Sequence, residues 1–184
     1  MSIPTILTLG RIVLIPVFVI CFYLPFKWSN ELATLVFVLA AFTDWLDGYL
    51  ARKLDQASPF GAFLDPVADK LMVTTALVVL VEANPDPMFA VPAAIIVGRE
   101  IAISALREWM AEIGERAQVA VSQLGKWKTT AQMSALILLI FHDSVFGLPV
   151  FEAGVTLLYL SAVLTLWSMW LYLRAAWPVL RAEG

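Results

Sequence analysis

Long apolar segments, each close to the length of a membrane span, follow one another along almost the whole chain. Of its 184 residues, 61% are hydrophobic and 15% are charged, whereas soluble domains carry about 25% charged residues. Because a helix needs about 20 apolar residues to cross a bilayer, six spans with short connections would take up nearly all of this length. The sequence therefore predicts an all-α integral membrane protein with six transmembrane helices and no separate soluble domain.

Prolines and charged residues interrupt the apolar segments and set the expected ends of the spans. The segment ANPDP at residues 83–87, for example, cannot continue a helix because it holds two prolines. We expect a single membrane-embedded domain over residues 1–184, with residues 1–11 as a juxtamembrane lead-in. The predicted spans lie near residues 12–26, 31–52, 61–82, 88–110, 124–141 and 150–172.

The distribution of Lys and Arg predicts the orientation of the chain. Of the 12 Lys and Arg residues, Lys27 alone falls in the first, third or fifth connection. A larger group lies in or beside the second and fourth connections and the tail: Arg52, Lys53, Arg107, Arg116, Lys126, Lys128, Arg174 and Arg181. Because cytoplasmic loops carry the excess of Lys and Arg, we expect both termini, and the connection between the second and third spans, at the cytoplasmic face.

Four aspartates lie on the second and third predicted spans, in a stretch that reads DWLDGYLARKLDQASPFGAFLDPVAD. Asp44 and Asp47 are three residues apart, so they share a helix face with Cβ atoms about 5 to 6 Å apart. Asp65 and Asp69 are four apart and share a face in the same way. The connection between the pairs is short, so adjacent antiparallel helices would bring all the carboxylates together. Such a group of like charges in a poorly hydrated site needs cations.

The ligand types narrow the choice of cation. Carboxylates without His or Cys favour hard cations such as Mg²⁺ or Mn²⁺. Four aspartates hold enough oxygens for two ions, the arrangement that clamps the attacking and leaving oxygens of a phosphoryl transfer. The lone Cys21 excludes a disulfide within the chain and a Cys-based metal site. The lone His142 falls in a turn on the far side of the membrane, and we assign it no chemistry.

Small residues and one arginine accompany the acids. Gly48, Ala51 and Gly61 remove bulk beside the acids, which would let a phosphorylated ligand approach the backbone. Arg52 supplies a planar fork that suits phosphate oxygens. The plain structural alternatives are ion pairs of the first two aspartates with Arg52 or Lys53, and a helix-cap role for the third. These alternatives explain single acids and not the whole group.

The acids, the small residues and the arginine together resemble the signature of the CDP-alcohol phosphotransferase family, with every motif position present. The pattern reads Asp44-x2-Asp47-Gly48-x2-Ala51-Arg52-x8-Gly61-x3-Asp65-x3-Asp69. The resemblance extends over essentially the whole chain, because the family core is six membrane helices with the motif on the second and third. It implies that the domain is catalytic, that the four aspartates hold two metal ions, and that Asp69 is also the general base.

The resemblance also implies which residues contact the nucleotide-diphosphate end of the donor. Gly48, Arg52 and Ser58 match such positions, and Thr8 and Arg11 are further candidates. Ser58 has an equally good alternative role as a helix cap, because Pro59 follows it.

Basic residues on the fourth and fifth predicted spans and their connection form a candidate anion site for a phosphorylated acceptor: Arg99, Arg107, Lys126 and Lys128. The alternative for Arg99 is a buried ion pair, and the alternative for Arg107 is a pairing with Glu108 or Glu112. For the two lysines the alternative is an ordinary cytoplasmic flank that attracts anionic lipid.

The flanking segments FGAFLDPVADK, REIAISALREWMAE and GKWKTTAQM narrow the resemblance. They are similar to family members that transfer the phosphatidyl group of CDP-diacylglycerol to glycerol 3-phosphate, giving phosphatidylglycerol phosphate and CMP in phospholipid biosynthesis. The resemblance implies a homodimer in the bacterial inner membrane, surrounded by membrane lipids and without a nucleic-acid partner. Inositol phosphate, serine or phosphatidylglycerol remain alternative acceptors. A divalent-cation transporter is a further alternative, but it predicts acids along a path through the bilayer rather than at one face.

Overall fold

A computed structural model of the chain describes residues 3–54, 59–113, 123–143 and 148–183. The predicted donor residue Ser58 lies outside these ranges. The side chains of Ala51, Arg52 and Lys126, three residues singled out from the sequence, also lie outside the description, although their backbone is helical.

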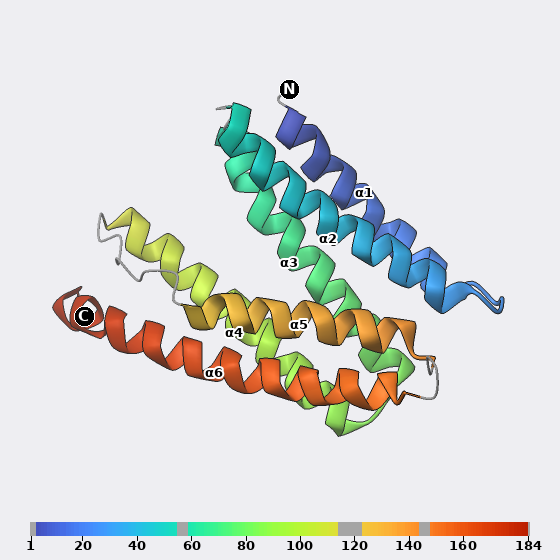
Figure 1. The fold of residues 1–184 in the computed structure, drawn as a ribbon. Coiled ribbons are helices and arrows are strands. Elements are labelled where there is room, and N and C mark those ends of the chain that lie inside the picture. The colour runs from blue at the N-terminus through green and yellow to red at the C-terminus, as the bar shows by residue number, and fades with distance from the viewer. Residues whose placement is uncertain (1–2, 55–58, 114–122, 144–147, 184) are drawn as a thin grey trace. The chain divides into compact units, whose positions relative to one another are not determined.

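The described residues form six helices, so the all-α prediction is confirmed (Figure 1). They are α1 (Ile3–Tyr23), α2 (Ser29–Leu54), α3 (Pro59–Ala83), α4 (Pro87–Glu112), α5 (Gln123–Phe141) and α6 (Val150–Glu183). The first helix begins at Ile3 and thus includes most of the segment that we expected to be a lead-in. The last helix continues to Glu183, well past the predicted end of its span at residue 172.

Length and composition allow four of the helices to cross a membrane: Thr5–Tyr23, Ser29–Leu50, Pro87–Glu112 and Val150–Pro178. The fifth helix contributes a shorter apolar stretch, Trp127–Phe141. The chain is therefore an integral membrane protein with four candidate spans among its described residues. That α3 and α5 also cross the bilayer stays a prediction.

Two helix ends show how local sequence sets these bounds. Asp86 caps the start of α4, because its side chain accepts a hydrogen bond from the Met88 backbone N–H at 2.7 Å, and Pro87 follows it where a missing N–H costs nothing. His142 ends α5 in the left-handed conformation, with φ of 62°, and its N–H donates to the Leu138 carbonyl at 3.1 Å. The only histidine is thus a helix cap.

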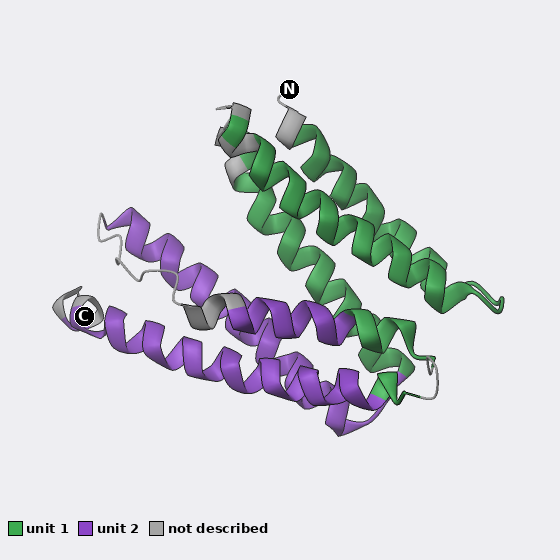
Figure 2. Ribbon diagram, in the orientation of Figure 1, with its two compact units in different colours: residues 1–83, 137–151 green, residues 84–136, 152–184 purple. Residues whose placement is uncertain are grey.

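The chain divides into two compact units (Figure 2). The first unit comprises residues 1–83 and 137–151, and the second comprises residues 84–136 and 152–184. All four aspartates of the motif belong to the first unit, and all four basic residues of the predicted acceptor site belong to the second.

In the first unit, α1 contacts both α2 and α3. The Phe18 ring of α1 is fully buried and lies 5.9 Å from the Phe37 ring of α2. Fully buried alanines occur on both of the other helices, Ala33 and Ala40 on α2 and Ala68 on α3. Small side chains let membrane helices approach closely, so α1 can carry its polar residues to both neighbours.

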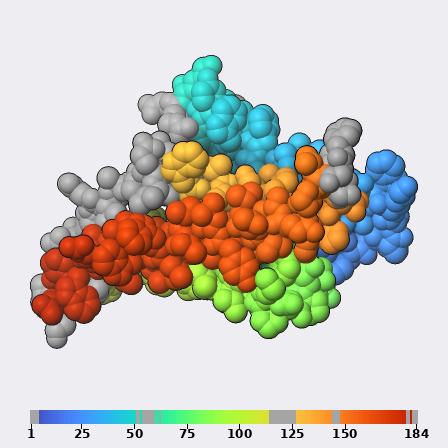
Figure 3. All heavy atoms as spheres, turned by 60° about the horizontal axis from the view of Figure 1, so that its bottom comes forward, coloured from blue at the N-terminus to red at the C-terminus, as the bar shows by residue number. Residues whose placement is uncertain are grey.

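Large apolar side chains cover the outward surfaces of several helices. On α6, Val163 and Trp167 are more than half exposed, and they line a shallow apolar groove together with Leu166 and Trp170. Figure 3 shows the side chains along α6, in orange to red. Exposed apolar surface of this kind suits contact with lipid, in keeping with the candidate spans.

Candidate active site

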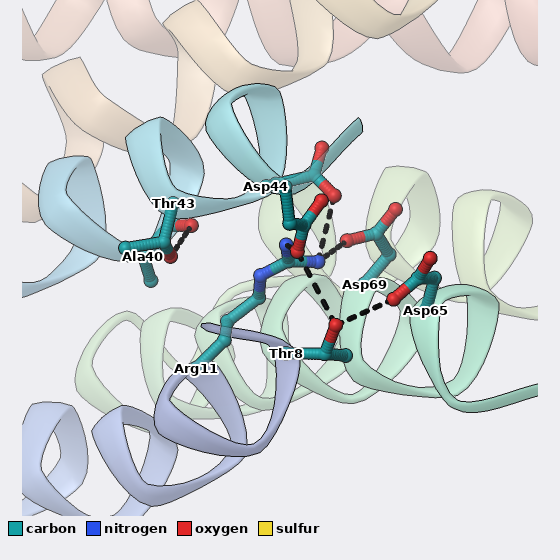
Figure 4. A network of polar contacts seen from close by, with 8 residues as sticks. Thr8, Arg11, Ala40, Thr43, Asp44, Asp65 and Asp69 are labelled. Carbon is teal, nitrogen blue, oxygen red and sulfur yellow. Dashed lines mark hydrogen bonds and ion pairs between the residues drawn. The ribbon is translucent and has the colours of Figure 1, made fainter. Parts of the chain in front are cut away.

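Helices α2 and α3 supply the four aspartates, two from each helix, and α1 supplies the residues that join them. Asp44 and Asp47 lie near the C-terminal end of α2, whereas Asp65 and Asp69 lie in the first half of α3. Figure 4 shows the side chains of Thr8 and Arg11 on α1 directed toward acids of both helices. The two pairs are therefore brought together through α1.

Arg11 is the centre of this group. Its Nη1 lies 2.7 Å from Asp44 Oδ1 and 2.5 Å from Asp69 Oδ1, and its Nη2 pairs with Asp47 Oδ2 (Figure 4). The Arg11 side chain is only 1% exposed. One guanidinium thus holds three carboxylates from two helices, because its planar fork offers donors in several directions.

Thr8 joins the remaining aspartate to the group. Its hydroxyl donates to Asp65 Oδ1 at 2.6 Å and also lies 3.3 Å from Asp47 Oδ2. A hydroxyl carries a single proton, so the shorter contact is the principal hydrogen bond. Thr8 is fully buried, and it links α2 and α3 one turn before Arg11 on the same face of α1.

The group is buried on one side and open on the other. The side chain of Asp47 is 3% exposed, whereas those of Asp44 and Asp69 are 45% and 50% exposed. A ligand can therefore reach Asp44 and Asp69, while Asp47 lies behind them. The open carboxylates come from different helices, so a ligand that contacts both also bridges α2 and α3.

The charges in the group do not balance. Arg11 supplies one positive charge to a set of four aspartates, and like charges in a poorly hydrated site need further cations. The donor set consists of oxygen atoms, which fits hard divalent cations. Within the described ranges, however, no three acid, His or Cys side chains are grouped as a metal site requires. The guanidinium lies between the acids instead, and the metal role of the four aspartates stays a prediction.

Two of the motif's small residues lie beside the acids. Gly48 directly follows Asp47 on α2, and Gly61 is buried near the start of α3. Ala51 and Arg52 continue α2, and their part in ligand binding stays a prediction, as does that of Ser58.

The second unit holds a separate group of charged side chains around Glu100. Its Oε1 accepts a hydrogen bond from Arg99 Nη1 at 2.8 Å and pairs with Lys128 Nζ of α5. Arg99 Nη2 also donates to Ser168 Oγ of α6 at 3.2 Å. The side chains of Arg99 and Lys128 are 13% and 7% exposed. The ion pair that was the structural alternative for Arg99 is present, and it is shared with a lysine.

Of the other predicted acceptor residues, Arg107 contacts a ring of α6 and Lys126 lies outside the description. The Arg107 guanidinium stacks over the Tyr172 ring at 5.4 Å, which holds it against α6. The Lys126 side chain is not described. Sequence reasoning did not single out Glu100 or Ser168 as site residues. An available signal for Glu100 was its position, an acid beside Arg99 inside an apolar segment.

A sequence profile of the CDP-alcohol phosphatidyltransferase family matches residues 1–167, which include both groups of charged residues. The chain belongs to this family. The resemblance carried by the aspartate motif is thereby confirmed, and members of the family are generally metal-dependent.

This chain matches curated relatives over nearly their full length. The chain is 53% identical over 185 residues to the CDP-diacylglycerol–glycerol-3-phosphate 3-phosphatidyltransferase of Pseudomonas fluorescens. The aligned region covers 100% of this chain and 94% of the relative. A protein of the same name from Sodalis glossinidius is 57% identical, over 96% of this chain and 95% of its own length. Another from Haemophilus influenzae is 55% identical, over 95% of this chain and 93% of its own length.

Proposed function

We propose that this chain transfers the phosphatidyl group of CDP-diacylglycerol to glycerol 3-phosphate, giving phosphatidylglycerol phosphate and CMP, in phospholipid biosynthesis. The observation that carries the proposal is the full-length identity of 53% to a relative with this activity in its name. The family profile covers the aspartate motif, which supplies the chemistry that such a transfer needs.

Asp44, Asp47, Asp65 and Asp69 would hold two Mg²⁺ or Mn²⁺ ions, the number that four carboxylates can serve. Bound there, the metal would neutralise the diphosphate of the donor and the charge that develops on the leaving CMP. The half-exposed Asp44 and Asp69 face the open side of the group, where the diphosphate would approach.

Asp69 is the proposed general base. Its carboxylate takes the proton from a hydroxyl of glycerol 3-phosphate, and that oxygen then bonds to the phosphorus that carries diacylglycerol. The bond from this phosphorus to the CMP oxygen breaks, and CMP leaves with the electron pair. The 50% exposure of the Asp69 side chain supports this role, because the acceptor hydroxyl must reach the base.

Residues on α1 and α2, together with Ser58, would bind the donor, and residues of the second unit would bind the acceptor phosphate. The donor set is Thr8, Arg11, Gly48, Arg52 and Ser58, and the acceptor set is Arg99, Arg107, Lys126 and Lys128. Arg99 and Lys128 both pair with Glu100, so the acceptor phosphate would have to compete with that carboxylate for them.

The reaction would take place at the cytoplasmic face of the bacterial inner membrane, where nucleotide donors and phosphorylated acceptors occur. The excess of Lys and Arg in or beside the second and fourth connections and the tail supports this orientation. A homodimer is part of the proposal, and the exposed apolar faces of the helices leave surface for it.

The test is CMP release from CDP-diacylglycerol by the purified protein, measured against glycerol 3-phosphate, inositol phosphate, serine and phosphatidylglycerol. Glycerol 3-phosphate is expected to give the highest rate. Asp69→Asn should lower that rate by about 10²–10⁴-fold, the usual contribution of a general base. Asp143→Asn is the matched control, because Asp143 is an exposed acid in the turn after α5. A normal rate for Asp69→Asn at saturating Mg²⁺ would contradict the base assignment.

A further inference from the structure

Arg11 makes contacts that a donor-binding arginine would have to give up. Its two terminal nitrogens are engaged by Asp44, Asp47 and Asp69, so they are occupied by acids of the protein itself. Its Nε is buried and has no hydrogen-bond partner among the described residues. A guanidinium carries five donors and stays charged at every physiological pH. The side chain is therefore tightly paired at one end and unsatisfied at the other.

The oxygens that hold Arg11 are also the oxygens that a divalent cation would need. Asp44 Oδ1, Asp47 Oδ2 and Asp69 Oδ1 all face the guanidinium. A Mg²⁺ ion requires such oxygens at about 2.0–2.1 Å, and a divalent cation beside a guanidinium repels it. Two divalent ions would neutralise four carboxylates without any help from Arg11. The guanidinium would then be a surplus positive charge inside a buried site.

We propose that Arg11 is a resident counter-ion that competes with divalent cations for Asp44, Asp47 and Asp69. Without metal, its guanidinium holds the acids of α2 and α3 together and offsets part of their repulsion. With metal, the guanidinium leaves the carboxylates and becomes available to an anion on the open side of the group. This inference rests on the metal role that belongs to the proposed function.

The first test measures metal affinity rather than catalysis. Mn²⁺ is titrated into the detergent-purified full chain without donor or acceptor, by calorimetry or by the loss of the free-ion electron-spin signal. Arg11→Gln removes the competing charge and should bind Mn²⁺ at least tenfold more tightly than the unmodified protein. Arg174→Gln is the matched control, because Arg174 is an exposed arginine of α6 that lies over the Trp170 ring, and the Mn²⁺ affinity of this variant should not change. Equal or weaker binding by Arg11→Gln would overturn the proposal and make Arg11 a fixed support of the site.

The second test uses the unmodified protein, so it does not depend on whether a variant folds. Phenylglyoxal labels accessible arginines, and the labelled fraction at each arginine is measured by peptide mass spectrometry. Saturating Mn²⁺ should raise the labelled fraction of Arg11 several-fold, and Arg99 in the same digest serves as the internal control. Labelling of Arg11 that does not respond to Mn²⁺ would overturn the exchange.

The two proposals fail in different ways. If metal raises the labelling of Arg11 but no acceptor supports CMP release, the displacement of Arg11 by metal is supported and the proposed transferase function is wrong. If CMP is released with glycerol 3-phosphate but metal does not change the labelling of Arg11, the proposed function is supported and the displacement of Arg11 by metal is wrong.

Discussion

Replacing Glu100 with Gln removes the carboxylate that Arg99 and Lys128 share. In the structure, Glu100 Oε1 accepts from Arg99 Nη1 at 2.8 Å and pairs with Lys128 Nζ. The Arg99 and Lys128 side chains are only 13% and 7% exposed. Glu100→Gln keeps the size of the side chain, so the change is mainly one of charge. It leaves two positive charges close together with little water to screen them.

The size of the effect follows from this burial. Removing one partner of a buried ion pair costs about 3–5 kcal/mol, because the other charge stays buried without compensation. Glu100 itself is 25% exposed, and solvent screens part of the interaction, so we expect the lower end, about 3 kcal/mol of the free energy of unfolding. For soluble domains of this size each kcal/mol shifts Tm by about 2–4 °C, which corresponds here to a fall of about 6–12 °C.

The assay is thermal unfolding of the detergent-purified protein, followed by tryptophan fluorescence. Glu152→Gln is the matched control, because Glu152 is an exposed acid in the first turn of α6, and its Tm should stay within about 2 °C of the unmodified protein. Adding glycerol 3-phosphate should restore part of the Tm of Glu100→Gln, because a bound phosphate replaces the missing negative charge. A Tm for Glu100→Gln equal to that of the control would refute the reasoning that this group is a buried charge network.

Other substitutions test the packing, the cap and the metal requirement. Phe18→Ala should lower the free energy of unfolding by about 3–5 kcal/mol, because the fully buried ring packs on Phe37; Val13→Ala, at a position 63% exposed, is its control in the same thermal assay. Asp86→Ala should cost about 0.5–2 kcal/mol by removing the cap of α4, whereas Asp86→Asn should keep most of that stability. Treatment with EDTA should abolish CMP release, and added Mg²⁺ or Mn²⁺ should restore it; activity that survives the chelator would contradict the metal requirement.

The sequence predicted the helices well because their signals are local. The fourth span was predicted to begin near residue 88, and α4 begins at Pro87, one residue earlier. Asp86 and Pro87 are the residues that start this helix. The pairing of acids along α2 and α3 follows from helical spacing alone. The helix α6 continues to Glu183, past the predicted end of its span, because hydropathy reports the width of the bilayer and not where a helix stops.

The way in which the acids meet could not be predicted from spacing. We expected α2 and α3 to bring the pairs together as adjacent helices. In the structure, Arg11 and Thr8 of α1 bridge them, and such a bridge depends on how three helices pack. Sequence reasoning included both residues only as further donor candidates. Their contacts with the acids give them a second role, which no local pattern indicated.

The bridge by α1 has a consequence for the order in which the site forms. Arg11 is made before any of the aspartates that pair with it. Asp44 and Asp47 follow on the next helix and Asp69 on the one after. The first helix therefore gains its full set of partners only when the third has been synthesised. The polar group therefore forms only once all three of the first helices have packed together.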